Sequence, residues 1–235
     1  MSSNPTIYNI IVFGEPSVGK TCFIDQAYYG RSFVSYEPDH MLPSHTMTVD
    51  GQASRLFLMD LSTSFLKPEQ RMHDNNWAKS MLADSEGIVL LYDVTSLESF
   101  RYITDQAYKF LWDCRKLKFE DGEEADEEER EKFGCVLVGN KADLVYTNKE
   151  TREVSQSLAE EWAQTQGIKN IEVDSLERNG PDNALELLVR NIRKIKRLTG
   201  LQASGVEKQE EETKEQAEKS SIRNTLKEIF KSPKT

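Results

Sequence analysis

The chain has 235 residues and a formal net charge of -10. A chain this acidic has no general attraction to nucleic-acid phosphates, so we expect no nucleic-acid partner. Its three cysteines have neither disulfide nor metal-ligand spacing and favour a reducing compartment, and the chain shows no signal peptide, membrane span or lipidation site. We therefore expect a cytoplasmic protein without a lipid anchor, which would reach a membrane only through its partners.

Short apolar runs alternate with stretches of helical periodicity along most of the chain. The runs predict strands over residues 7–13, 45–49, 55–59, 87–92, 135–138 and 168–173. The periodic stretches predict helices over residues 21–29, 77–82, 97–117, 151–166 and 183–198. The 151–166 helix is expected to begin with an acid-rich turn, and residues 62–73 are expected to be irregular.

The order of these elements predicts the fold class. Asp50-Gly51 lies between two strand-like runs and is typical of a hairpin, which makes one strand antiparallel. The remaining strands alternate with helices, as in a parallel sheet. We expect an α/β domain with a six-stranded, mostly parallel sheet, one antiparallel strand and helices on both faces.

Two segments depart from this pattern. Residues 118–132 form an acidic insertion, which is either a solvated loop or a surface for a basic partner. Residues 201–235 are rich in Glu, Lys and Gln, which predicts a disordered or loosely helical tail. The expected domain therefore covers residues 1–200.

Residues 14–21 read GEPSVGKT and fit the P-loop pattern G-x-x-x-x-G-K-[ST], between a predicted strand and a predicted helix. In such a loop, backbone N–H groups and the helix dipole hold phosphate. Lys20 would neutralise the β- and γ-phosphates, and the Thr21 hydroxyl would ligate Mg²⁺. The predicted phosphate-binding residues are Gly14, Glu15, Ser17, Val18, Gly19, Lys20, Thr21 and Cys22. Pro16 lacks an N–H and removes one possible donor.

Asn140-Lys141-Ala142-Asp143 follows a late strand. Together with the P-loop after the first strand, this motif resembles the Ras-like small GTPases over about residues 6–198. The resemblance implies a P-loop G domain that binds GTP or GDP with Mg²⁺. It also implies a monomer that acts in signal transduction, through effector or regulatory proteins that contact its switch loops.

The resemblance also implies roles at the base. Asp143 would accept two hydrogen bonds from guanine, Asn140 would brace the loops, and the Lys141 stem would lie over the base. Ser175 matches the family, and Leu176 would act there through its backbone N–H. Phe33 would pack against the base, with a loop aromatic folded onto the core as the alternative.

The switch regions differ from the family. Asp60 matches the aspartate that holds Mg²⁺, usually through water. Asp39 replaces a switch threonine, so it either ligates Mg²⁺ or keeps its loop away from the nucleotide. The family's D-x-x-G-Q has Thr63 at the glycine and Ser64 at the glutamine, which normally orients the attacking water.

Because Ser64 is too short for that task, we assign no catalytic residue. We expect a small GTPase with slow or impaired hydrolysis. The alternative is a pseudo-GTPase, an interaction module stabilised by bound nucleotide. Asn140, Lys141 and Asp143 disfavour an ATP-dependent enzyme.

Overall fold

A computed structural model describes residues 4–30, 43–67, 75–116, 133–177 and 179–198. The chain divides into two units, residues 1–193 and 194–235, and the first contains the sheet. Phe33, Asp39, the acidic insertion and the tail from residue 201 lie outside the described residues. None of the helices in the described ranges combines the length and apolarity that a bilayer crossing requires.

The first unit contains one sheet of six strands, in the order β2-β3-β1-β4-β5-β6. The strands are β1 (Thr6–Gly14), β2 (His45–Val49), β3 (Gln52–Ser62), β4 (Gly87–Asp93), β5 (Gly134–Asn140) and β6 (Lys169–Glu172). Only the β2–β3 pair is antiparallel, and its turn places Asp50 at φ 50° and Gly51 at φ 74°. These positive φ values suit a tight hairpin turn, so the predicted hairpin and fold class are confirmed.

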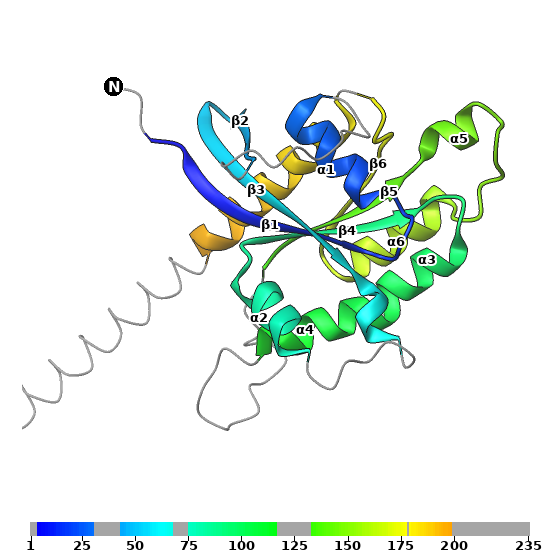
Figure 1. Ribbon diagram of the computed structural model, residues 1–235, viewed down its shortest axis with the longest axis horizontal. Helices are drawn as coiled ribbons and strands as arrows, with labels where there is room; N and C mark the ends of the chain where they lie inside the picture. Colours follow the sequence, from blue (N-terminus) through cyan, green and yellow to red (C-terminus); the bar gives the residue numbers. More distant parts are fainter. Residues whose placement is uncertain (1–3, 31–42, 68–74, 117–132, 178, 199–235) are drawn as a thin grey trace, which may run out of the picture. The chain divides into compact units, whose positions relative to one another are not determined.

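Helices follow most of the strands (Figure 1). They are α1 (Lys20–Tyr29), the 3₁₀ turn η1 (Thr63–Leu66), α2 (Asn76–Asp84), α3 (Leu97–Tyr102), the π-helical turn η3 (Ile103–Ala107), α4 (Tyr108–Lys116), α5 (Ala142–Tyr146) and α6 (Gln156–Thr165). A last helix begins at residue 180, and its residues up to 193 belong to the first unit.

Two local predictions were wrong. The helix expected over 151–166 begins only at Gln156, because the Ser155 hydroxyl caps it by accepting a hydrogen bond from the Leu158 N–H at 3.2 Å. Its first turn therefore contains no acidic residue. The segment expected to be irregular from residue 62 continues β3 through Ser62 and then forms η1, where burial of Phe65 orders the chain.

The core has two layers, one on each face of the sheet. Along β1, Ile11 and Phe13 face one layer and Ile10 and Val12 the other, as the two-residue period of a strand requires. The first layer packs against α2, α3, α4 and α6, and the second against α1 and the last helix. Figure 1 shows α2 and α4 on one side of the strands and α1 on the other.

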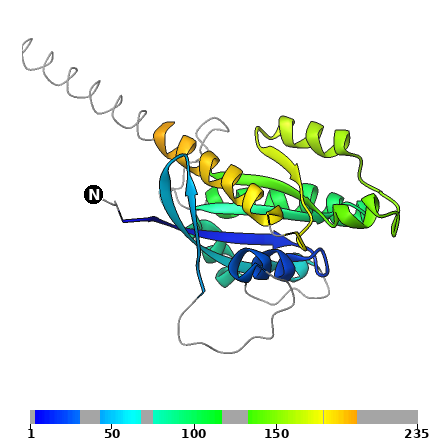
Figure 2. The ribbon, with the colours of Figure 1, turned by 90° about the horizontal axis from the view of Figure 1, so that it is seen from above.

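The last helix is tied to the β2–β3 hairpin by Arg193. Its guanidinium donates to the Val49 carbonyl at 2.7 Å, to the Ser54 hydroxyl at 2.9 Å and to the Tyr8 hydroxyl at 3.3 Å. Figure 2 shows this helix beside the hairpin.

The carboxyl ends of the central strands meet at one edge. Gly14 pairs with Ser62, and Asp93 pairs with Asn140. Ligands of such sheets bind outside the carboxyl ends of the strands, so the functional site is expected at this edge.

Candidate functional site

The loop between β1 and α1 packs closely on its neighbours. A Cβ on Gly14 would lie 2.4 Å from the Leu91 carbonyl oxygen, and one on Gly19 would lie 2.3 Å from Asn140 Nδ2. Gly19 also has φ 99°, and Ser17 has φ 66°. Left-handed residues turn successive N–H groups inward and form a concave anion site, so the loop has the backbone form of a phosphate cradle.

The Lys20 side chain is 7% exposed and lies over this loop. Its Nζ donates to the Glu15 carbonyl at 2.8 Å and lies 3.7 Å from Asp60 Oδ1. Burial lowers the pKa of Lys20, and the charges of Asp60 and Glu15 oppose that shift. The site thus holds a largely buried cation whose present partners are a backbone oxygen and a partly exposed carboxylate.

Thr21 and Asp60 bring oxygen atoms together beside Lys20. The Thr21 hydroxyl donates to Asp60 Oδ2 at 3.0 Å. Hydroxyl and carboxylate oxygens suit Mg²⁺, which binds few protein ligands and takes the rest from water and phosphate. The described residues include no group of three His, Cys, Asp or Glu that could hold a metal alone. The Thr21 and Asp60 oxygen atoms are donors of the kind that Mg²⁺ prefers, so the residues present fit this ion.

Cys22 lies one residue further along α1 and is half-buried. Burial, followed by the Asp25 charge, raises the pKa of its thiol. A raised pKa keeps the thiol protonated, so Cys22 is not an activated nucleophile.

An ion pair that the sequence did not reveal joins this loop to the segment after β3. Lys67 Nζ lies 2.7 Å from Glu15 Oε1, and the Glu15 carboxylate is largely buried. Nothing in the sequence pattern marked Lys67, because it lies in a polar stretch expected to be irregular.

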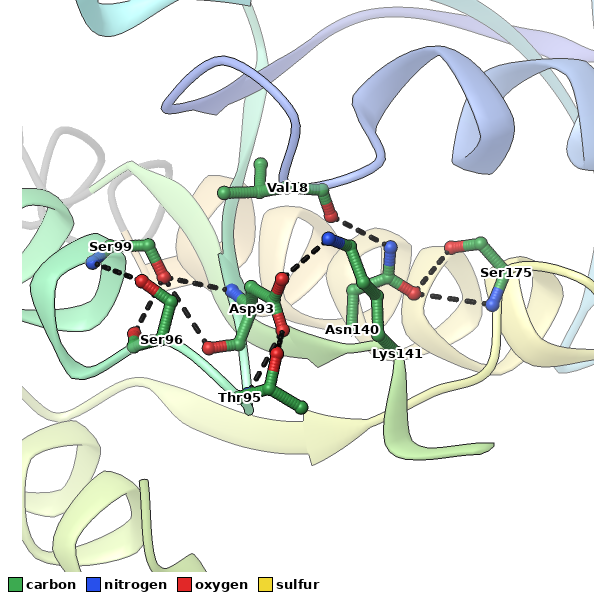
Figure 3. A network of polar contacts seen from close by, with 8 residues as sticks. All are labelled: Val18, Asp93, Thr95, Ser96, Ser99, Asn140, Lys141 and Ser175. Carbon is green, nitrogen blue, oxygen red and sulfur yellow. Dashed lines mark hydrogen bonds and ion pairs between the residues drawn. The ribbon is translucent and has the colours of Figure 1, made fainter. Parts of the chain in front are cut away.

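Asn140, at the end of β5, connects three segments (Figure 3). Its Nδ2 donates to the Val18 carbonyl at 2.9 Å. Its Oδ1 accepts from the Ser175 N–H at 3.2 Å and from the Ser175 hydroxyl at 2.7 Å. The P-loop, the end of β5 and the turn after β6 are thus held together by one buried amide.

Lys141 is paired with a residue that the sequence reasoning missed. Its Nζ lies 2.5 Å from Asp93 Oδ2, at the end of β4. Asp93 Oδ1 accepts from the Thr95 N–H at 2.9 Å and the Thr95 hydroxyl at 2.7 Å, which orients the carboxylate. An aspartate that directly follows a buried run at this edge was the available signal.

Asp143 and Leu176 lie beyond this network. Burial, followed by the Asp174 charge, raises the pKa of Asp143. The Leu176 side chain is 55% exposed, while its N–H donates to Asp174 Oδ1 at 2.7 Å. The Leu176 N–H is thus paired with Asp174, and a ligand that used this donor would have to take the place of the Asp174 carboxylate.

In the segment after Asp60, the side chains of residues 63–65 are buried or bonded within their own turn. Thr63 is fully buried, and its hydroxyl has no hydrogen-bond partner among the described residues. The Ser64 hydroxyl lies 2.9 Å from the Ser62 hydroxyl, within its own turn. Phe65 packs on Phe13, with ring centroids 6.3 Å apart.

Several of the predicted residues that lie in described segments are joined by contacts at one edge of the sheet. Asp60 meets the P-loop through Lys20 and Thr21, and Ser175 meets it through Asn140 and Val18. Phe33 and Asp39 lie outside the described residues, so their roles stay predictions.

Comparison with known proteins bears on this geometry. Residues 9–194 match the family model of the Ras family. Protein ras-1 of Neurospora crassa is 27% identical over 200 residues, which cover 84% of this chain and 82% of that protein. GTP-binding protein YPTM1 of Zea mays is 26% identical over 194 residues, or 81% and 80% of the two chains. Ras-related protein Rab-4 of Dictyostelium discoideum is 28% identical over 190 residues, or 79% of each chain.

Proposed function

Because the chain belongs to the Ras family, whose members are GTP-binding small GTPases, we propose that it binds GTP and GDP with Mg²⁺ and hydrolyses GTP slowly. The observation that carries this proposal is the cluster of Lys20, Thr21 and Asp60 beside a loop with left-handed backbone at Ser17 and Gly19. The maize relative is named a GTP-binding protein, which supports the choice of nucleotide.

In this proposal the loop N–H groups and Lys20 bind the phosphates. A helix N-terminus and a buried ammonium both favour anions, and phosphate would relieve the burial cost of the Lys20 charge. Thr21 and Asp60 would hold Mg²⁺, which supplies further positive charge against the phosphates when it is bound.

The base would be selected at the other end of the site. Asp143 would accept hydrogen bonds from guanine, and Leu176 would offer its N–H. A buried hydrogen-bonding site rejects ligands that lack the matching groups by large factors, so adenine nucleotides should bind poorly. Asn140 would keep this end and the P-loop at a fixed separation, through its bonds to Val18 and Ser175.

Slow hydrolysis is supported by the segment after Asp60. Ser64 is engaged with Ser62, and the Thr63 side chain is buried. Neither the Ser64 hydroxyl, held within its own turn, nor the buried Thr63 offers a side chain of the length that the family uses to orient the attacking water. Fast hydrolysis in such enzymes requires a water-positioning group.

A non-catalytic pseudo-GTPase is the second candidate. The observation that favours it is the fixing of the segment after Asp60 by Phe65 and by the Lys67–Glu15 ion pair, which makes this segment a weak sensor of the nucleotide. Under either candidate we propose a cytoplasmic monomer that signals through effector or regulatory proteins.

The test has two steps on the purified full chain. Chromatography of the copurified nucleotide should give GDP or GTP, and a chain that carries only ATP or ADP would contradict guanine binding. Single-turnover hydrolysis of preloaded GTP should take many hours. A rate equal to that of ordinary family members would contradict the proposal of slow hydrolysis. It would also contradict the pseudo-GTPase alternative.

A further inference from the structure

The P-loop contains a buried carboxylate where it should bind an anion. Glu15 follows Gly14 directly, is 7% exposed, and has its Oε1 2.7 Å from Lys67 Nζ. Without a counter-ion, a carboxylate here would repel phosphate by Coulomb's law, and the low dielectric of a buried site strengthens this repulsion.

The Glu15 charge also acts on Lys20, the residue that is proposed to bind the phosphates. The Glu15 carbonyl oxygen accepts a hydrogen bond from the Lys20 ammonium at 2.8 Å. Burial lowers the pKa of Lys20, and the Glu15 charge is among those that raise it. The loop acid and the phosphate-binding cation are therefore coupled electrostatically.

Lys67 is held in place by the segment that carries it. Its N–H donates to the Ser64 carbonyl at 3.0 Å, which closes η1. Phe65 anchors that turn, with its ring 5.7 Å from Trp77 and 5.5 Å from Phe110, centroid to centroid. The ammonium also lies 5.3 Å from the Tyr102 ring centroid, in cation–π range.

Ion pairs on the surface contribute little, but this one differs in its burial. The Glu15 side chain is 9% exposed and that of Lys67 is 34% exposed. Removal of one partner of a buried pair leaves the other charge uncompensated, which costs much more than the pair contributes. Removal of the Lys67 charge should therefore weaken phosphate binding, because the Glu15 carboxylate would be left uncompensated.

We propose that Lys67 is a positioning residue for the P-loop, whose ammonium neutralises Glu15 and so lets the loop bind nucleotide phosphates. The inference rests on the proposed nucleotide binding and adds a residue to it. It makes nucleotide affinity depend on Lys67 only while Glu15 is charged.

The experiment measures the affinity and dissociation rate of fluorescent GDP with Mg²⁺ on the full chain. Wild type is compared with Lys67→Met, Glu15→Gln, the double variant and Lys67→Arg. Lys109→Met is the matched control, since Lys109 is an exposed lysine of α4 and its loss changes net charge equally. Circular dichroism checks that each variant is folded.

Lys67→Met should weaken GDP binding roughly tenfold, because the largely buried Glu15 charge is then left in the phosphate-binding loop without its counter-ion. The double variant and Lys67→Arg should return to within about threefold of wild type by the same charge argument. Recovery in the double variant is the readout that a purely structural role of Lys67 would not produce.

Two results would overturn the inference while leaving nucleotide binding intact. Lys67→Met could match Lys109→Met, in which case the ion pair has no role. The double variant could remain as weak as Lys67→Met, in which case Lys67 acts by another route than Glu15. Absence of GDP binding in wild type would instead overturn the proposed function, and the inference with it.

Discussion

Replacement of Asn140 by alanine would remove three hydrogen bonds from a side chain that is 2% exposed. The Val18 carbonyl and both Ser175 donors would lose their partner. At about 1 kcal/mol for each bond, the free energy of unfolding should fall by about 3 kcal/mol. For a domain of this size that corresponds to a melting point lower by about 6–12 °C.

Asn140→Asp distinguishes the hydrogen bond to Val18 from the two hydrogen bonds with Ser175. It keeps an acceptor for Ser175 but places a carboxylate oxygen against the Val18 carbonyl. At low pH the new carboxyl can be protonated and can donate to the Val18 carbonyl. There Asn140→Asp should lose less unfolding free energy than Asn140→Ala. At neutral pH the P-loop should be pushed away from β5, and GDP should dissociate faster.

Urea denaturation of nucleotide-free protein and the dissociation rate of fluorescent GDP measure the two effects. Asn170→Ala on β6 is the matched control, because Asn170 Oδ1 has no partner among the described residues. If Asn140→Ala matched Asn170→Ala in both assays, the assignment of Asn140 as the link between P-loop and base end would be wrong.

Two further substitutions should raise stability. The Tyr92 hydroxyl is fully buried without a partner in the described part of the chain, so Tyr92→Phe should stabilise the fold by about 1 kcal/mol, and a lower melting point would contradict this. Burial and then Asp174 raise the pKa of Asp143 above 3.8, so its ionisation disfavours the folded state as pH rises through the raised pKa. Nucleotide-free Asp143→Asn should therefore unfold at higher urea than wild type at neutral pH, with no difference once pH is well below 3.8. A difference of opposite sign at neutral pH would refute that account, and GDP binding should weaken in the same variant.

The fold was predictable where the sequence has strong periodicity. The buried runs of β1, β4 and β5 and the Asp50-Gly51 turn determine a mostly parallel sheet with one hairpin, and the structure confirms both. The start of α6 was misjudged because acidic residues before it suggested a first turn. Glu153 instead accepts a hydrogen bond from the Leu97 N–H at 2.9 Å, at the start of α3. Local pattern cannot show that a side chain is used by a distant element.

The candidate site shows the same division. The P-loop and Asn140-Lys141-Ala142-Asp143 could be found because each is a compact motif. Asp93 could have been noticed at its strand end, but its pairing with Lys141 could not be predicted, and neither could the pairing of Lys67 with Glu15, since only the folded chain brings these segments together. Pairs of opposite charge are common in any chain, and the sequence does not select among them.

The contacts of Arg193 bear on how the chain acquires its fold during synthesis. Arg193 binds Val49 and Ser54 in the hairpin and Tyr8 in the first strand, and the last helix also covers one face of the sheet through Leu188 and Ile192. Until these residues have been synthesised, α1 is the one helix of the described residues that packs on that apolar face. Because translation is sequential, this face of the sheet is completed only after the helix that begins at residue 180 has been made.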